Sequence, residues 1–251
     1  MIRVILCGYS GRMGHVVREI IAERDDMSIV AGVDPRETDA PFVTFTNIAD
    51  CDTDADVIID FTSPKTLDDG LLEVAKSKKA AVVLCTTGYS TEQLDKINEA
   101  SREIAILRSA NMSLGINTMA KLIQEAAKVL ANNGFDIEVV ERHHNQKLDA
   151  PSGTALLLAD AMQKVLDEDY EYVYDRSGRR MKRPKNEIGI SAVRGGSIVG
   201  EHEVIFAGLD EVIEIKHTAY SRAVFGKGAV AAAAFLAGKP AGMYDMTAVV
   251  K

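Results

Sequence analysis

The chain has 251 residues and a formal net charge of -8 at neutral pH. Such a chain lacks the excess of Lys and Arg needed to bind nucleic acid or an anionic membrane through general electrostatic attraction, so we expect neither as a partner. Its length and its 47% hydrophobic content suit a globular protein with one large domain or two modest ones.

The cysteines Cys7, Cys51 and Cys85 are few and odd in number, and none forms a CxxC pair. Neither a disulfide framework nor a metal site is therefore expected. The first apolar run reaches Gly8 too early for a signal peptide, and no later run approaches the length of about eighteen apolar residues that a membrane span needs. We predict a cytoplasmic protein.

The N-terminal segment predicts a strand, a glycine turn, a helix and a second strand. An apolar run at 2–6 leads into GYSGRMG, with glycines at Gly8, Gly11 and Gly14, and the helix is expected to end near Glu23. The first gap between glycines is one residue longer than in the usual dinucleotide-binding motif. The glycines permit a tight turn, close approach of backbone N–H groups to a pyrophosphate, and close packing of the helix on the sheet.

Asp34 ends the second predicted strand. A carboxylate at this place can accept hydrogen bonds from the ribose diol of adenosine, which favours NAD, whereas NADP requires a cation for its 2′-phosphate. Arg12 and Arg36 are candidate cations, so the use of both cofactors is our hypothesis. The alternative is that the glycine turn is structural and that Asp34 only caps a loop.

Further buried strands are predicted at 57–60 and 81–85, and the segment IAILRSAN has the same pattern of an apolar run followed by small or polar residues. Small or polar residues follow each strand, in the turns 61–63, 86–88 and 109–111. Each turn alone could be an ordinary strand-to-helix connection. Because parallel strands present their carboxyl ends at one edge, the three turns together predict cofactor contacts on a doubly wound, Rossmann-type parallel α/β sheet.

After about residue 113 the pattern changes. Helices are expected in INTMAKLIQEAAKVLA and TALLLADAMQKVL, and the strand-like runs are 188–194, 199–207 and 211–219. These elements predict a second α+β domain, with an open mixed sheet covered by helices on one face. The alanine-rich helix AVAAAAFLAG is expected to pack back against the first domain. The basic run RSGRRMKRPK lacks interleaved aromatic residues and is interpreted as a solvated loop.

The segment EVVERHHNQKLDAPSGTA combines His143, His144 and Lys147. A lysine offers positive charge and a proton, and a histidine titrates near neutral pH. The alternative is a solvated strand end, because adjacent strand side chains point to opposite faces and only one histidine would reach a site unless the strand breaks near Asn145. The remaining histidines are interpreted as structural, and they are His15, His202 and His217.

The turn after Lys147 leads into a helix. Ser152 can cap that helix, and the N–H groups of Gly153 and Thr154, with the Thr154 hydroxyl, then make a natural carboxylate site. Positive charge beside a helix N-terminus predicts a compact substrate with more than one carboxylate.

Several motifs together resemble the 4-hydroxy-tetrahydrodipicolinate reductase family, also called dihydrodipicolinate reductase: GYSGRMG, DFTSP, TTGYS, ERHHNQKLDAPSGTA, IGISAVRGGSIVGEHEVIFAG and GKPAGMYDM. The resemblance runs essentially end to end. It implies NAD(P)H-dependent reduction of 4-hydroxy-tetrahydrodipicolinate to tetrahydrodipicolinate in the diaminopimelate route to lysine. It also implies a homotetramer, a dinucleotide-binding domain formed by 1–113 and 219–251, and a substrate-binding and oligomerisation domain formed by 114–218.

The resemblance assigns roles to individual residues. It implies that His143 donates or accepts a proton, that Lys147 is a proton donor, and that His144 contacts the substrate. It also implies that Gly153 and Thr154 hold a substrate carboxylate, and we predict that Ser152 belongs to the same substrate-binding turn. The cofactor contacts that it implies are Gly8, Tyr9, Ser10, Gly11, Arg12, Met13, Asp34, Cys85, Thr86, Thr87, Ser109, Ala110, Asn111 and Met112.

Two positions depart from the family pattern. Cys85 replaces the first glycine of a Gly-Thr-Thr-Gly turn, and Pro35 stands where some members have an arginine suited to NADP. The choice between NADH and NADPH therefore stays open. The alternatives to the family's reaction are a non-catalytic NAD(H)-sensing regulator and a nicotinamide oxidoreductase for another small carboxylated substrate.

Overall fold

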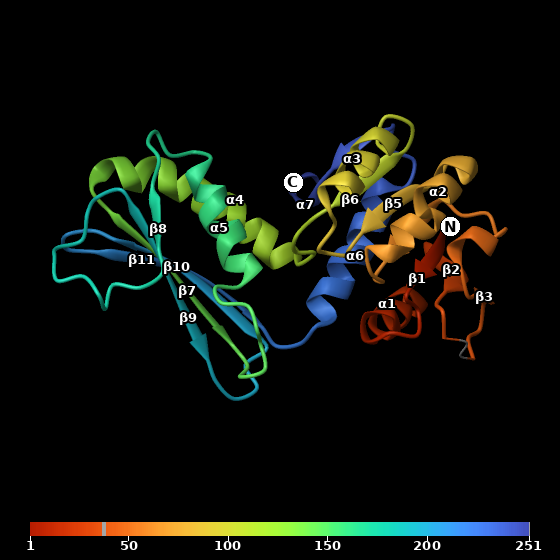
Figure 1. The fold of residues 1–251 in the computed structure, drawn as a ribbon, viewed down its shortest axis with the longest axis horizontal. Coiled ribbons are helices and arrows are strands. Elements are labelled where there is room, and N and C mark those ends of the chain that lie inside the picture. Colours follow the sequence, from red (N-terminus) through yellow and green to blue (C-terminus); the bar gives the residue numbers. More distant parts are fainter. Residues whose placement is uncertain (37–38, 251) are drawn as a thin grey trace. The chain divides into compact units, whose positions relative to one another are not determined.

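The computed structural model describes residues 1–36 and 39–250, and the chain forms two compact units (Figure 1). Unit 1 comprises Met1–Leu114 and the C-terminal segment from Ala223, and unit 2 comprises Gly115–Arg222. The sequence predicted boundaries after residues 113 and 218. The chain therefore leaves unit 1 once and returns to complete it.

Unit 1 is built on a seven-stranded sheet in which every pairing is parallel. Its strands, in spatial order, are β12 (Gly242–Tyr244), β6 (Ala105–Arg108), β5 (Ala81–Leu84), β4 (Val57–Asp60), β1 (Ile2–Cys7), β2 (Met27–Val33) and β3 (Val43–Phe45). The predicted Rossmann-type fold is confirmed. The edge strands β3 and β12 were not predicted, because runs of three residues carry too little periodicity to be recognised.

Helices cover both faces of this sheet. They are α1 (Arg12–Ala22), α2 (Leu72–Lys78), α3 (Thr91–Ala100), α6 (Ala223–Leu236) and α7 (Met246–Val249), with short helical segments at Ile48–Asp50 and Leu67–Leu71. Val4 and Leu6 of β1 join the core on the α1 and α6 side, whereas Ile5 and Cys7 join the core on the α2 and α3 side. Both faces are buried, which explains why these strands read as continuous apolar runs.

The alanine-rich helix α6 returns to unit 1 and packs on α1, β4, β5 and β6. Close approach requires its small residues: a Cβ atom at Gly226 would lie 2.6 Å from Val16 Cγ1. At Gly228 a Cβ atom would lie 1.6 Å from the carbonyl oxygen of Met112. The predicted return of this helix to the first domain is confirmed.

Unit 2 contains a mixed five-stranded sheet. Its strands, in spatial order, are β11 (Val212–Ala219), β10 (Gly200–Ala207), β7 (Asp136–His143), β9 (Glu187–Arg194) and β8 (Glu171–Val173). Strand β7 runs parallel to β9 and antiparallel to β10. The helices α4 (Leu114–Leu130) and α5 (Gly153–Gln163) pack against one face, where Ile137 and Val139 of β7 meet Ala155 and Leu158. Side chains alternate along β7, so Glu141 and His143 lie on this same buried face.

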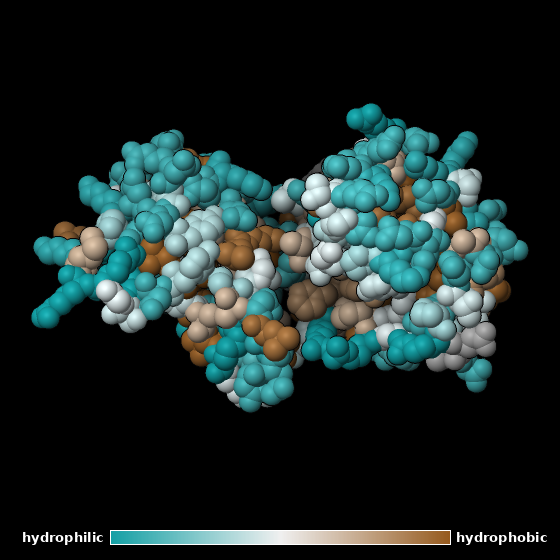
Figure 2. Space-filling view, viewed as in Figure 1, coloured by the Kyte–Doolittle hydropathy of each residue, from teal (hydrophilic) through white to brown (hydrophobic). Residues whose placement is uncertain are grey.

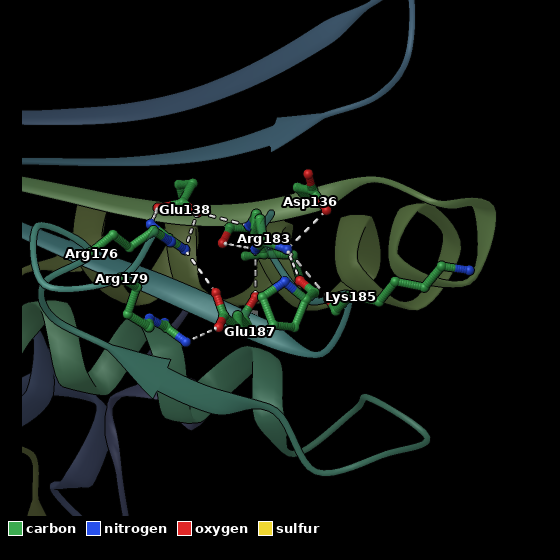
Figure 3. A network of polar contacts seen from close by, with 9 residues as sticks. Asp136, Glu138, Arg176, Arg179, Arg183, Lys185 and Glu187 are labelled. Atoms are coloured by element: carbon green, nitrogen blue, oxygen red, sulfur yellow. Dashed lines mark hydrogen bonds and ion pairs between the residues drawn. The ribbon is translucent and has the colours of Figure 1, made fainter. Parts of the chain in front are cut away.

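The basic run 176–185 is not simply a solvated loop, and that interpretation is wrong for three of its arginines (Figure 3). Arg176 Nη2 lies 2.8 Å from Glu138 Oε1, and Arg183 Nε lies 3.1 Å from the same oxygen. Arg179 Nη1 lies 2.8 Å from Oε1 of the buried Glu187. Sequence composition could not reveal these pairs, because the acids lie on β7 and β9 rather than in the loop.

The visible face of both units is mostly hydrophilic (Figure 2). Within residues 1–36 and 39–250, no helix has both the length and the apolar character that crossing a membrane requires.

We predict that Gly228→Ala destabilises the protein by about 1 to 3 kcal/mol, the usual cost of overpacking a core. This cost should outweigh the gain in helix propensity, because the new Cβ atom would meet the backbone of Met112. Urea unfolding measures the change. Gly178→Ala is the control, since a Cβ atom there has nothing within 4 Å. Equal stability of the two variants would contradict the packing of α6.

Candidate active site

The turn between β1 and α1 has the backbone geometry of a phosphate site. Gly8 adopts a φ of +82°, and a Cβ atom at Gly14 would lie 2.2 Å from the Gly8 carbonyl oxygen, so the helix start packs directly on the turn. Helix α1 begins at Arg12, and the N–H groups of its first turn have no acceptor within the helix. The N–H groups of Arg12 and Met13 are therefore suited to bind a pyrophosphate.

Asp34 is 3% exposed and follows the end of β2. It accepts hydrogen bonds from Ser10 Oγ at 2.7 Å and from the backbone N–H of Arg36 at 3.0 Å. Burial alone would raise the pKa of Asp34, but these hydrogen bonds outweigh it and lower the pKa below its usual value. Asp34 is thus an ionised carboxylate that joins the glycine turn to the segment after β2.

A cavity of about 480 Å³ lies beside Asp34, entirely within unit 1. It is bordered by the glycine turn, the end of β2 and the segment after β4, through residues that include Gly8, Gly11, Asp34, Arg36, Thr62 and Lys65. Two cations stand at this cavity with side chains that are 70% (Arg36) and 76% (Lys65) exposed. Arg36 was predicted as a cation for a 2′-phosphate, whereas Lys65 was not, because no motif marks it. Arg12 lies outside the lining, at the exposed start of α1.

Asp60, at the end of β4, joins two of the predicted turns, and the sequence did not indicate this role for it. It is 1% exposed and accepts hydrogen bonds from Thr86 Oγ1 at 2.9 Å, from the backbone N–H of Thr62 at 3.1 Å, and from Thr62 Oγ1. Burial raises the pKa of Asp60 although these donors oppose it. The side chain of Thr86 is therefore directed at Asp60, while Thr87 is exposed.

Two of the predicted cofactor contacts have side chains that lie in the core. The Tyr9 ring is fully buried and packs edge-on against Phe42, with ring centroids 5.6 Å apart. Met112 is also part of the unit 1 core. In this structure both residues could contact a cofactor only through backbone atoms. Burying an apolar side chain in the core is more favourable in free energy than exposing it at the edge of the sheet.

The remaining predicted contacts lie at the carboxyl ends of β5 and β6. Burial raises the pKa of the Cys85 thiol well above its usual value, so Cys85 stays uncharged. Ser109 Oγ donates to the Asn111 carbonyl at 2.9 Å, and Asn111 Oδ1 accepts from the Ser113 N–H at 2.8 Å. Ala110 is exposed beside them. These bonds order the turn that follows β6.

In unit 2 the strand β7 ends at His143, and His144 lies in the turn that follows. The Lys147 N–H donates to the His144 carbonyl at 3.2 Å, which closes that turn. The strand therefore breaks after His143, as the sequence suggested. His143 is 8% exposed, and Lys147 Nζ lies 2.8 Å from Asp149 Oδ1.

Helix α5 begins at Gly153 with Ser152 as its N-cap, and Ser152 Oγ accepts from the Ala155 N–H at 3.2 Å, which confirms the predicted cap. Asp149 lies at this helix start. The Lys147 side chain, together with a hydrogen bond from the Gly153 backbone, lowers the pKa of Asp149. The site predicted for a substrate carboxylate thus attracts a carboxylate of the protein itself.

Beneath His143 lies a buried network that the sequence analysis did not predict. His143 Nδ1 lies 2.5 Å from Oε2 of Glu141, which is fully buried. His202 packs edge-on to His143, with ring centroids 5.1 Å apart, and its Nε2 lies 3.0 Å from Ser152 Oγ. His202 was predicted to be structural; it is buried, but it lies directly beside the candidate site.

Burial lowers the pKa of both histidines. For His143 the desolvation outweighs the opposing effect of Glu141. For His202 burial and the nearby His143 lower the pKa to about 3. Both rings are therefore neutral at pH 7.

Family models and named relatives both identify the family of this chain. A family model described as the N-terminus of dihydrodipicolinate reductase matches residues 2–112, and one described as its C-terminus matches residues 115–250. The chain belongs to the dihydrodipicolinate reductase family. A 4-hydroxy-tetrahydrodipicolinate reductase from Clostridium tetani is 52% identical over 98% of this chain and 96% of its own length. Its counterpart from Caldanaerobacter subterraneus subsp. tengcongensis is 53% identical over 100% of this chain and 99% of its own length.

The dihydrodipicolinate reductase fold is seen in a solved relative. A dipicolinate-bound dihydrodipicolinate reductase from Paenisporosarcina sp. TG-14 matches with a TM-score of 0.80 and 24% identity, over 98% of this chain and 97% of that chain. The match to the N-terminal family model ends at residue 112 and the match to the C-terminal one begins at residue 115. The boundary between unit 1 and unit 2 lies in the same place.

We predict that His202 makes the protein less stable as the pH falls. Below about pH 6.5 the unfolded chain protonates this histidine, while the folded chain keeps it neutral down to about pH 3, so the unfolded state binds more protons throughout this window. The free energy of unfolding should fall by up to about 1.4 kcal/mol per pH unit from this residue. Chemical unfolding of His202→Gln across the window should show a shallower slope. His15→Gln, on the exposed face of α1, is the control, and equal slopes in both variants would contradict the prediction.

Proposed function

We propose that this protein reduces 4-hydroxy-tetrahydrodipicolinate to tetrahydrodipicolinate with NADH or NADPH, in the diaminopimelate route to lysine. Membership of the dihydrodipicolinate reductase family supports the reaction, as do full-length relatives that carry this name at about half identity. The observation that carries the proposal is local. Lys147 Nζ lies 2.8 Å from the Asp149 carboxylate, in the segment between the buried His143 and the start of α5.

The cofactor half of the site lies in unit 1. The N–H groups at the start of α1 would hold the pyrophosphate of a bound cofactor, and Asp34 would accept hydrogen bonds from its adenosine ribose. Arg36 and Lys65 stand at the same cavity, where a cation can meet a 2′-phosphate. We therefore propose that both cofactors are used.

The substrate half of the site lies in unit 2. The substrate carries two carboxylates, and the N–H groups of Gly153 and Thr154, with the Thr154 hydroxyl, receive one of them. Ser152 positions this helix start as its N-cap. The incoming carboxylate takes the place of Asp149 beside Lys147, and His144 contacts the substrate from the turn.

The proton needed in the reaction comes from Lys147. When bound, the reduced nicotinamide supplies a hydride for C4 of the conjugated imine that remains after loss of water. The enamine that results is protonated at the neighbouring carbon. His143 is neutral, because burial lowers its pKa, and its Nδ1 hydrogen is directed at Glu141. Lys147 is thus the donor, and its charge also offsets the negative charge that develops in the transition state.

We further propose a cytoplasmic homotetramer. The buried thiols of Cys7 and Cys51 are free, which suits a reducing compartment. The face of the five-stranded sheet away from α4 and α5 carries exposed apolar side chains such as Val212 as well as ion pairs such as Arg142–Glu203, with 3.0 Å between the charged groups. Such a face is suited to packing against another chain. Light scattering tests the assembly, and a monomeric particle would contradict it.

The proposed function predicts rapid oxidation of both NADH and NADPH when the condensation product of pyruvate and aspartate semialdehyde is generated in the cuvette. Absorbance of the reduced cofactor measures each rate. We expect Michaelis constants for the two cofactors within about a hundredfold of each other. Asp34 favours the ribose diol of NADH, whereas Arg36 and Lys65 favour the 2′-phosphate of NADPH. Cofactor binding without oxidation of either cofactor would instead indicate the sensing regulator.

Replacing Lys147 with alanine should reduce kcat by about 10² to 10⁴, the usual range for loss of a general acid. The dissociation constant of the cofactor should be nearly unchanged, because Lys147 lies in the other unit from the glycine turn. Lys164→Ala, at the exposed C-terminal end of α5, is the matched control. A Lys147→Ala enzyme within tenfold of the wild type would exclude this role.

A further inference from the structure

Glu141 is the most extensively bonded acid of unit 2, yet neither motif nor family resemblance assigned it a role. Its side chain is 0% exposed and lies on β7 two residues before His143, on the same face of the sheet. Its Oε2 accepts from His143 Nδ1 at 2.5 Å and from Arg194 Nη1 at 2.8 Å. Its Oε1 accepts from Arg194 Nη2 at 2.7 Å and from the Ser152 N–H at 3.0 Å.

The carboxylate of Glu141 is ionised in spite of its burial. Desolvation would raise its pKa, but the hydrogen bonds from Arg194, His143 and Ser152 outweigh it and lower the pKa. Arg194 is held in turn, because its Nη2 donates to the Asp149 carbonyl at 2.6 Å. A cation from β9 therefore neutralises a fixed negative charge directly under His143.

An ionised carboxylate can only accept hydrogen bonds, so its contact with Nδ1 places the ring hydrogen of neutral His143 on Nδ1. The Nε2 atom then carries a lone pair. The space beside it is kept open by Gly200 of the neighbouring strand β10, where a Cβ atom would lie 3.1 Å from Nε2. The other nitrogen of the ring is thus prepared as an acceptor.

We propose that Glu141, held by Arg194, is a positioning residue for the proposed reductase: it fixes the tautomer and the orientation of His143, so that Nε2 is presented unprotonated to the substrate site. This inference rests on the proposed function, which places His143 in that site. In this arrangement Nε2 of His143 can accept a hydrogen bond from the substrate, while Lys147 donates the proton. Carboxylates that orient histidines in this way are common in catalytic and metal sites.

The charges around His143 predict what happens when Glu141 is neutralised. The groups that face the ring are Glu141 on β7, Arg194 on β9, His202 on β10 and Lys147 in the turn. Glu141 favours the protonated ring, whereas burial and the cations Lys147 and Arg194 oppose it. Glu141→Gln should therefore lower the pKa of His143 further and release the choice of tautomer.

The first test determines which ring nitrogen of His143 carries the hydrogen. Long-range ¹H–¹⁵N spectra of the full chain labelled at histidine report which nitrogen carries the hydrogen, and His143→Gln assigns the signal. We expect the Nδ1–H form of His143 in the wild type and a mixture of tautomers in Glu141→Gln. A wild-type ring protonated on Nε2 would overturn the proposal without any kinetic measurement and without any substrate.

The second test is kinetic. Glu141→Gln should lower kcat about 10- to 100-fold, move the acidic limb of the pH profile to lower pH, and leave KM for the cofactor within about twofold. Glu141→Asp keeps the charge and should recover part of kcat. Glu138→Gln is the matched control, because Glu138 lies on the same strand and is also paired with arginines, but on the opposite face.

The outcomes separate positioning from stability. If Glu141→Gln and Glu138→Gln lose activity equally, with the His143 tautomer unchanged, the role of Glu141 is structural and the proposal fails. If Glu141→Gln does not fold, Arg194→Lys is the alternative variant. Lysine should hold Glu141 less firmly, so we expect a smaller loss of kcat and the same change of the His143 tautomer. If the wild type shows the Nδ1–H form but oxidises neither cofactor, the proposed function fails while the coupling of Glu141 to His143 stands.

Discussion

A carboxylate removed from water must be surrounded by donors, and the candidate site of this protein depends on that constraint in both units. In unit 2 the fully buried Glu141 recruits Arg194 from β9 and the Ser152 N–H from the start of α5. One acid thereby joins two strands and a helix. The strand end that carries His143 and the helix start that we propose to receive a substrate carboxylate are held together by the same charge.

Unit 1 uses the same constraint twice, at the carboxyl ends of its parallel strands. Asp34 ties the glycine turn to the segment after β2 through Ser10 and Arg36. Asp60 ties the turn after β4 to the turn after β5 through Thr62 and Thr86. A doubly wound sheet brings these turns to one edge, but the acids hold them in order there. Pyrophosphate, ribose and nicotinamide contacts in the proposed function all depend on loops arranged in this way.

The fold could be predicted from sequence where a signal was local. Apolar runs marked the central strands of unit 1, and strand-like runs marked β9, β10 and β11 in unit 2. The edge strands β3 and β12 escaped because they span three residues each. The arginines of the run 176–185 were misjudged for a different reason. Their partners Glu138 and Glu187 are supplied by strands, and an ion pair across a sheet leaves no trace in the composition of a loop.

The sequence by itself determined the glycine turn with Asp34, the break after His143, and the Ser152 cap, because each depends on residues close together in the chain. Only the tertiary structure decided that Tyr9 and Met112 turn into the core, that Asp60 bridges two turns, and that Glu141 and Arg194 lie under His143. Those facts depend on which strands become neighbours. Neighbours far apart in the chain are selected by the packing of the whole sheet, which no short motif records.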